Sequence, residues 1–110
     1  MTDEEILARL PLPEEVIKAY ELNNLRPRAE YADVTDGMTC AIGACNGRNS
    51  QYPVREFAET RGVNQLDVRH FGVGFDSGYL GKDTMTLTDV AFLRGKEVGQ
   101  AVRKHFSKEV

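Results

Sequence analysis

The sequence lacks any long apolar run. No stretch of about 18 consecutive apolar residues occurs among its 110 residues, so a transmembrane helix is not expected. The first residues, Met1-Thr2-Asp3-Glu4-Glu5, are acidic, whereas a secretory signal or transit peptide carries basic residues there. We therefore expect a cytoplasmic protein that does not bind a membrane.

Residues that bind metals or attack substrates are scarce. The chain has two cysteines, Cys40 and Cys45, and two histidines, one of which is His70. The two cysteines are five positions apart, which is wider than the usual metal-binding pairs, and a structural zinc site needs four ligands. Asp67 and His70 could share a helix face as metal ligands or as a base with its orienting acid, but no second such pair exists.

Motifs that signal a cofactor or a reaction are also missing. The sequence contains no Walker phosphate loop, no dinucleotide-fold glycine spacing and no serine-hydrolase elbow. We therefore expect no catalytic residue, no metal and no cofactor, and we interpret both cysteines as small buried residues. A thiol or metal enzyme that uses Cys40, Cys45, Asp67 and His70 is the third alternative.

The composition is that of one folded domain. Apolar residues make up 41% and charged residues 28%, which is enough to bury a core, and 110 residues suit a single domain over 1–110. The chain has no tryptophan and a net charge of −3. Proteins that bind nucleic acid without sequence preference are more often basic, so the overall charge argues against that class.

The sequence predicts an all-α fold of four to six short helices. Start and stop signals place helices from the Thr2 cap, from Pro13, over 54–62, from the Asn64 cap to Gly81, and over 89–106. A polar loop is expected over 26–36. The apolar segment 39–45 is interpreted as a helix capped by Asp36, although periodicity alone cannot distinguish it from a strand. A strand there would make the fold α+β.

Two glycine pairs, Gly74 with Gly78 and Gly95 with Gly99, lie in the last third of the chain. Each pair is four residues apart and lies on one helical stripe with phenylalanines, and a glycine inside a helix costs about 1 kcal/mol relative to alanine. Close approach of two helices would offset this cost, so we predict an antiparallel, glycine-lined hairpin, or alternatively a homodimer seam or a ligand groove. The stripe of packing or interaction residues is Phe71, Gly74, Phe75, Gly78, Phe92, Gly95 and Gly99.

Part of this region resembles the ribosome modulation factor family, in which glycines and aromatics recur as G-[FY]-x-x-G before a second glycine-containing helix. The matching residues are Gly74-Phe75-Asp76-Ser77-Gly78 and Phe92-Leu93-Arg94-Gly95. The resemblance covers about a quarter of the chain, and that family is basic whereas this chain is acidic. No function is transferred from it.

The segment 54–72 resembles the helix-turn-helix of repressor-like DNA-binding domains. Ala58 occupies the small position of the first helix, Gly62 the turn, and Val68 the apolar anchor of the second helix. Arg61 departs from the pattern, because the residue before the turn glycine is usually apolar. Leu66 would be exposed near the tip of the second helix.

The resemblance implies a set of DNA-contacting residues. Asn64, Gln65 and Arg69 would face the base edges, because amides suit adenine and arginine suits guanine. Phosphate contacts would come from Arg48, Arg55 and Arg61. The alternative is an ordinary helical corner that packs against other helices.

The sequence favours a small non-enzymatic protein that acts as a protein-interaction module. Its acidity and size suit an inhibitor or immunity-type protein that covers a basic site on its partner. The second hypothesis is a dimeric helix-turn-helix DNA-binding regulator with its motif at 54–72. Neither hypothesis identifies the partner.

Overall fold

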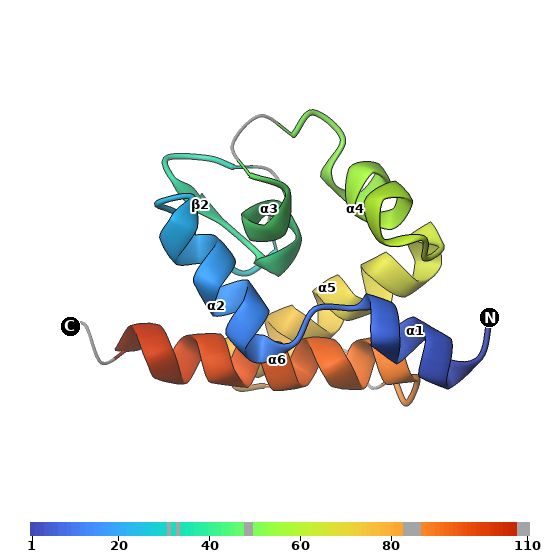
Figure 1. Cartoon of the computed structure of the whole chain (residues 1–110). Helices are drawn as coiled ribbons and strands as arrows, with labels where there is room; N and C mark the ends of the chain where they lie inside the picture. Colours follow the sequence, from blue (N-terminus) through green and yellow to red (C-terminus); the bar gives the residue numbers. More distant parts are fainter. Residues whose placement is uncertain (31, 33, 48–49, 83–86, 108–110) are drawn as a thin grey trace.

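Helices account for most of the structure, a computed structural model that describes residues 1–30, 32, 34–47, 50–82 and 87–107. Figure 1 shows how the helices are arranged. Buried residues of all six helices form one hydrophobic core. The helices are α1 (Asp3–Arg9), α2 (Pro13–Leu22), α3 (Ala41–Asn46), α4 (Pro53–Arg61), α5 (Gln65–Leu80) and α6 (Val90–Ser107). The predicted all-α class is therefore confirmed.

Most helix ends lie where the sequence signals place them. The Thr2 hydroxyl accepts a hydrogen bond from the Glu5 N–H, and the Glu5 side chain accepts from the Thr2 N–H, which is a complete capping box. The Asn64 side chain accepts from the Asp67 N–H at 2.8 Å and starts α5. Gly62 and Gly81 end α4 and α5 in the left-handed conformation, with φ of 67° and 73°.

The segment 39–45 combines the two alternatives left open by its sequence. Strand β2 (Met38–Thr39) pairs in parallel with β1 (Arg26–Pro27), and α3 follows directly after Cys40. The expected Asp36 cap is wrong. Asp36 has a φ of 55° and lies in the turn before β2, because pairing with β1 keeps Met38 and Thr39 extended and delays the helix.

Helices α5 and α6 pack with their backbones in contact. A Cβ added to Gly74 would overlap the carbonyl oxygen of Phe92, and one added to Gly78 would overlap that of Lys96. Gly95 and Gly99 contact the backbone of α5 in the same way. The predicted close approach of the two glycine-bearing helices is therefore confirmed, and it explains why alanine is not used at these positions.

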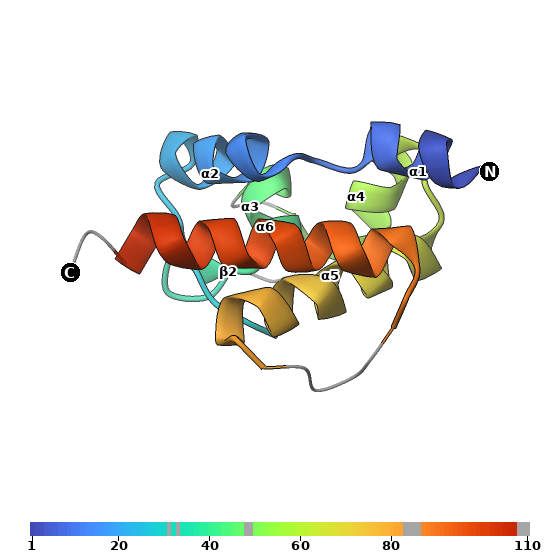
Figure 2. The same cartoon turned by 90° about the horizontal axis from the view of Figure 1, so that it is seen from below.

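The two helices run in the same direction, so the predicted antiparallel arrangement is wrong. Gly95 packs against the carbonyl of Phe71 and Gly99 against that of Phe75, so contacts advance toward the carboxyl end on both helices (Figure 2). The connection over 81–89 has nine residues. Nine extended residues reach about 30 Å, which exceeds the length of about 24 Å for a helix of 16 residues. The connection is therefore long enough to return to the start of α5.

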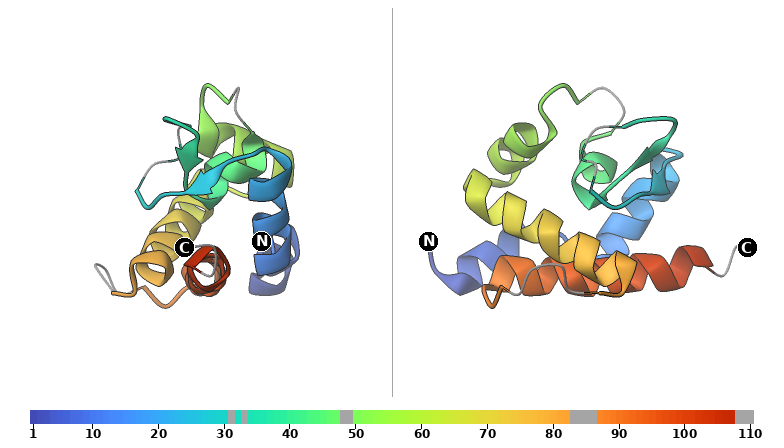
Figure 3. Two further views of the ribbon diagram at one scale, coloured as in Figure 1. Left: turned by 90° about the vertical axis from the view of Figure 1, so that its left-hand side faces the viewer. Right: turned by 180° about the vertical axis from the view of Figure 1, so that it is seen from behind.

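Helix α6 lies between α5 on one side and α1 with α2 on the other, while α3 and α4 cover the opposite face of the core (Figure 3). The guanidinium of Arg94, on α6, donates to the carbonyl of Leu7 at 3.3 Å and to that of Leu10 at 3.2 Å. These bonds fix α1 against the first half of α6. The second half of α6 extends beside the last turn of α5.

Candidate functional site

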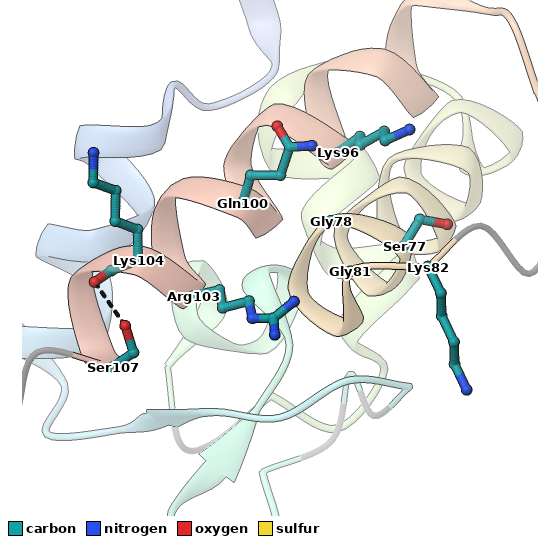
Figure 4. A pocket seen from close by; sticks show the side chains of 9 residues that line it. All are labelled: Ser77, Gly78, Gly81, Lys82, Lys96, Gln100, Arg103, Lys104 and Ser107. Atoms are coloured by element: carbon teal, nitrogen blue, oxygen red, sulfur yellow. Dashed lines mark hydrogen bonds between the residues drawn. The ribbon is translucent and has the colours of Figure 1, made fainter. Parts of the chain in front are cut away.

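An open groove of about 560 Å³ lies where α5 ends against the second half of α6 (Figure 4). Residues near the end of α5 form one wall and residues of α6 form the other. Because the helices are parallel, their carboxyl ends lie at the same end of the molecule. The lining residues are Ser77, Gly78, Gly81, Lys82, Lys96, Gln100, Arg103, Lys104 and Ser107.

The groove is positively charged. Lys82, Lys96, Arg103 and Lys104 line it, and none of the lining residues that the structure describes carries a carboxylate. Within the described residues, Lys82, Arg103 and Lys104 form no ion pair. The net charge of −3 therefore hides a local concentration of positive charge.

Gly81, which ends α5, makes room for the Arg103 side chain. A Cβ on Gly81 would overlap the Arg103 guanidinium, so the absence of a side chain there lets the guanidinium lie against the end of α5. Its charge complements the negative carboxyl end of that helix. Figure 4 shows Arg103 directed toward Gly81, while the ammonium groups of Lys82, Lys96 and Lys104 point away from one another.

The α6 wall is a polar stripe. Its lining residues recur at helical spacing, over about 16 Å of the helix axis, at positions 96, 100, 103, 104 and 107. Sequence analysis missed this groove. The spacing of Lys96, Gln100, Arg103 and Lys104 was a usable signal, but the position of Lys82 beside them depends on the parallel packing.

The predicted stripe lies in the interior. Its seven members, Phe71, Gly74, Phe75, Gly78, Phe92, Gly95 and Gly99, are all buried within one chain. They are occupied in packing α5 against α6, so they offer no surface for a second copy. Only Gly78 also contributes to the wall of the groove.

The segment 54–72 contains two helices and the predicted turn glycine. Helices α4 and α5 meet at Gly62, and the expected inward residues Ala58 and Val68 are buried. The three expected base-reading residues, Asn64, Gln65 and Arg69, are exposed on the first turns of α5.

Two of the arginines expected to contact phosphates, Arg55 and Arg61, already interact with other side chains. Arg55 pairs with Glu59 at 3.3 Å. The Arg61 guanidinium pairs with Glu15 and lies 5.0 Å from the centre of the Phe57 ring. Arg48 lies outside the described residues.

Both cysteines are poor nucleophiles. Burial raises the pKa of the Cys40 thiol to about 12 and that of the Cys45 thiol to about 11. The reactive species is the thiolate, so at neutral pH nearly every molecule holds both thiols protonated. Cys40 is buried as predicted, whereas Cys45 is only partly buried, so the prediction that both are buried is wrong for Cys45.

Alkylation should follow from these pKa values. In the native protein at neutral pH, Cys45 should react with iodoacetamide about a hundredfold more slowly than a free thiol, and the buried Cys40 more slowly still. Both should react rapidly in denaturant. Mass spectrometry of timed samples measures this, and rapid labelling of the native protein at either position would contradict it.

His70 pairs with Asp89 and not with Asp67, the acid that the sequence suggested. His70 Nδ1 lies 3.0 Å from Asp89 Oδ2, just before α6, rather than beside Asp67. The pair joins the starts of α5 and α6. Across the part of the chain that the structure describes, no cluster of three or more histidine, cysteine or acidic side chains could hold a metal ion.

Comparison with protein-family models, with curated proteins and with solved structures finds no match to this chain. None of the helices in the described ranges has the length and apolarity that crossing a bilayer needs. The arguments for function therefore come from the surface of this protein.

Proposed function

We propose that the protein is a non-enzymatic protein-interaction module that binds its partner through the surface formed by α1 and the first half of α6. The observation that carries this proposal is a hollow of about 250 Å³ between these helices, lined by Leu7, Val90, Leu93, Arg94 and Glu97. Leu93 is 52% exposed although it lies at the edge of a packed helix pair. An apolar centre with a charged rim is the usual form of a protein interface.

The surroundings of this hollow indicate the chemistry of the partner. The first turn of α1 carries the exposed carboxylates Asp3, Glu4 and Glu5. A partner with an apolar side chain flanked by basic residues would complement both features. This agrees with an inhibitor or immunity-type protein that covers a basic site.

The hollow is held in shape before binding. The Arg94 side chain is only 14% exposed, and its bonds to the carbonyls of Leu7 and Leu10 tie α1 to α6. A preformed surface loses little conformational entropy when the partner binds.

A matched pair of variants tests this surface. Leu93→Asp places a charge in the hollow, whereas Leu22→Asp places it at the end of α2, where Leu22 is 76% exposed. Tagged wild-type protein should co-purify with a specific partner from the cells in which the chain occurs. Leu93→Asp should lose that partner at least about tenfold, and Leu22→Asp should retain it. Equal retention by both folded variants would contradict the proposal.

A second candidate function is a DNA-binding regulator, favoured by the exposure of Asn64, Gln65 and Arg69 on one end of α5. Selection from random duplexes should then yield a preferred sequence. Alanine at all three positions should abolish that preference, at a cost of about 1–3 kcal/mol for each lost base contact. If no sequence is enriched, or if the triple variant keeps the same preference, this function is excluded.

A further inference from the structure

We propose that the groove at the carboxyl ends of α5 and α6 binds the phosphodiester backbone of a nucleic acid. This site is separate from the protein-binding hollow, because no residue lines both: Lys96 and Gln100 of α6 line the groove, whereas Arg94 and Glu97 line the hollow. The juxtaposition of Lys82 with Lys96, Arg103 and Lys104 carries the inference. The proposal does not depend on Asn64, Gln65 and Arg69 at the start of α5, or on the net charge of the chain.

The composition of the groove favours nucleic acid over a protein. Among the residues that the structure describes, its lining contains no aliphatic or aromatic side chain, only lysine, arginine, glutamine, serine and glycine. Protein interfaces usually centre on apolar or aromatic anchors, which this surface lacks. Lysine, arginine, glutamine and serine are the side chains that contact phosphate oxygens.

The arrangement of the charges favours a chain of phosphates over a single small anion. A compact anion is held by groups that converge on one point, whereas the ammonium groups of Lys82, Lys96 and Lys104 diverge (Figure 4). The polar stripe of α6 extends for about 16 Å, which is enough to follow two or three successive phosphates. The described lining residues include no aromatic side chain for base stacking, so binding should show little sequence preference.

Part of the positive charge has a second role. Arg103 lies against the carboxyl end of α5, and cations there stabilise the helix itself. A test must therefore separate loss of binding from loss of folding. Neutral substitutions, checked by thermal unfolding, serve this purpose.

The experiment measures fluorescence anisotropy of labelled oligonucleotides of about 20 nucleotides at two salt concentrations. Separate arms with single-stranded RNA, single-stranded DNA and duplex DNA distinguish the sources of the backbone. With four cationic contacts, the log–log salt slope on a single strand should be about −3. Arg103→Gln with Lys104→Gln should weaken binding about tenfold and reduce the slope by about half.

A single-site control locates the binding surface. Lys18→Gln, compared with Lys104→Gln alone, removes one positive charge from an exposed position on α2 and should change affinity less than twofold. No binding at low salt would overturn the proposal, as would equal weakening by Lys18→Gln and Lys104→Gln. Loss of binding in the Asn64, Gln65 and Arg69 alanine variant would assign the contact to the start of α5 and would overturn it as well. Equally tight binding of polyglutamate would assign the groove to an acidic protein instead and would also overturn it.

Discussion

Replacing Gly95 with alanine is expected to destabilise the protein by about 3 kcal/mol. The added Cβ would overlap the carbonyl oxygen of Phe71 and would lie 2.9 Å from its carbonyl carbon and 3.0 Å from the Phe75 nitrogen. All three atoms belong to the backbone of α5, which cannot move by a rotamer change. The two helices would have to separate, and the buried side chains beside the contact would lose their packing.

Gly72 offers a matched control within the same helix pair. A Cβ on Gly72 would lie 3.2 Å from Cδ1 of Ile42, the far end of a side chain that can shift by a few tenths of an ångström. Alanine also favours the helix by about 1 kcal/mol, so Gly72→Ala should be neutral or slightly stabilising. Denaturant unfolding followed by circular dichroism measures both variants. Similar stability of the two proteins would show that the backbones of α5 and α6 are not in contact.

This contact also shows how far sequence analysis could reach. Two glycine pairs spaced by four residues, each with phenylalanines on the same stripe, were enough to predict close packing between α5 and α6. The direction of packing was not encoded there, because a four-residue repeat matches a second one in either orientation. The nine residues of 81–89 are few enough for an antiparallel pair and numerous enough to run the length of α5, which a parallel pair requires. The sequence therefore allowed both directions.

The consequences of this direction extend to the groove. An antiparallel pair would have placed the end of α5 beside the start of α6, with Lys82 far from Arg103. The parallel pair brings Lys82 to the same end as the cations of α6. A site formed by the ends of both helices could not be predicted, because the predicted direction of packing was the reverse of the observed one.

In the region 54–72, the local structure could be predicted from the sequence, but a contact with a distant helix could not. Its turn and its buried and exposed positions follow from local signals, namely Gly62, the Asn64 cap and the apolar spacing of Ala58 and Val68. Local signals do not report what a distant helix does. The pairing of Arg61 with Glu15 of α2 therefore could not be predicted, and it removes one expected phosphate contact.

A second large loss of stability is expected for Gly43→Ala, at about 2–3 kcal/mol. Gly43 lies in the segment whose type the sequence left open. An added Cβ would overlap the Thr39 hydroxyl and the carbonyl oxygen of Ala32. These two atoms form a hydrogen bond at 3.1 Å that ties the loop before β2 to Thr39 of that strand. The Thr39 carbonyl also accepts from the buried Tyr20 hydroxyl at 2.8 Å, so displacement of Thr39 would disturb α2 as well.

The partners of Gly43 differ from those of Gly95 in one respect that can be measured. One of the two groups that overlap a Cβ at Gly43 is a side chain, so Thr39→Ala removes the hydroxyl part of the clash and leaves the Ala32 carbonyl and the Cβ of residue 39, at 2.9 Å. In a double-mutant cycle, Gly43→Ala should therefore cost at least about 1 kcal/mol less in the Thr39→Ala background than in the wild type. Strictly additive free energies would show that Thr39 does not limit the space at Gly43. No single side-chain truncation should relieve Gly95→Ala, because the three atoms nearest its Cβ are all backbone.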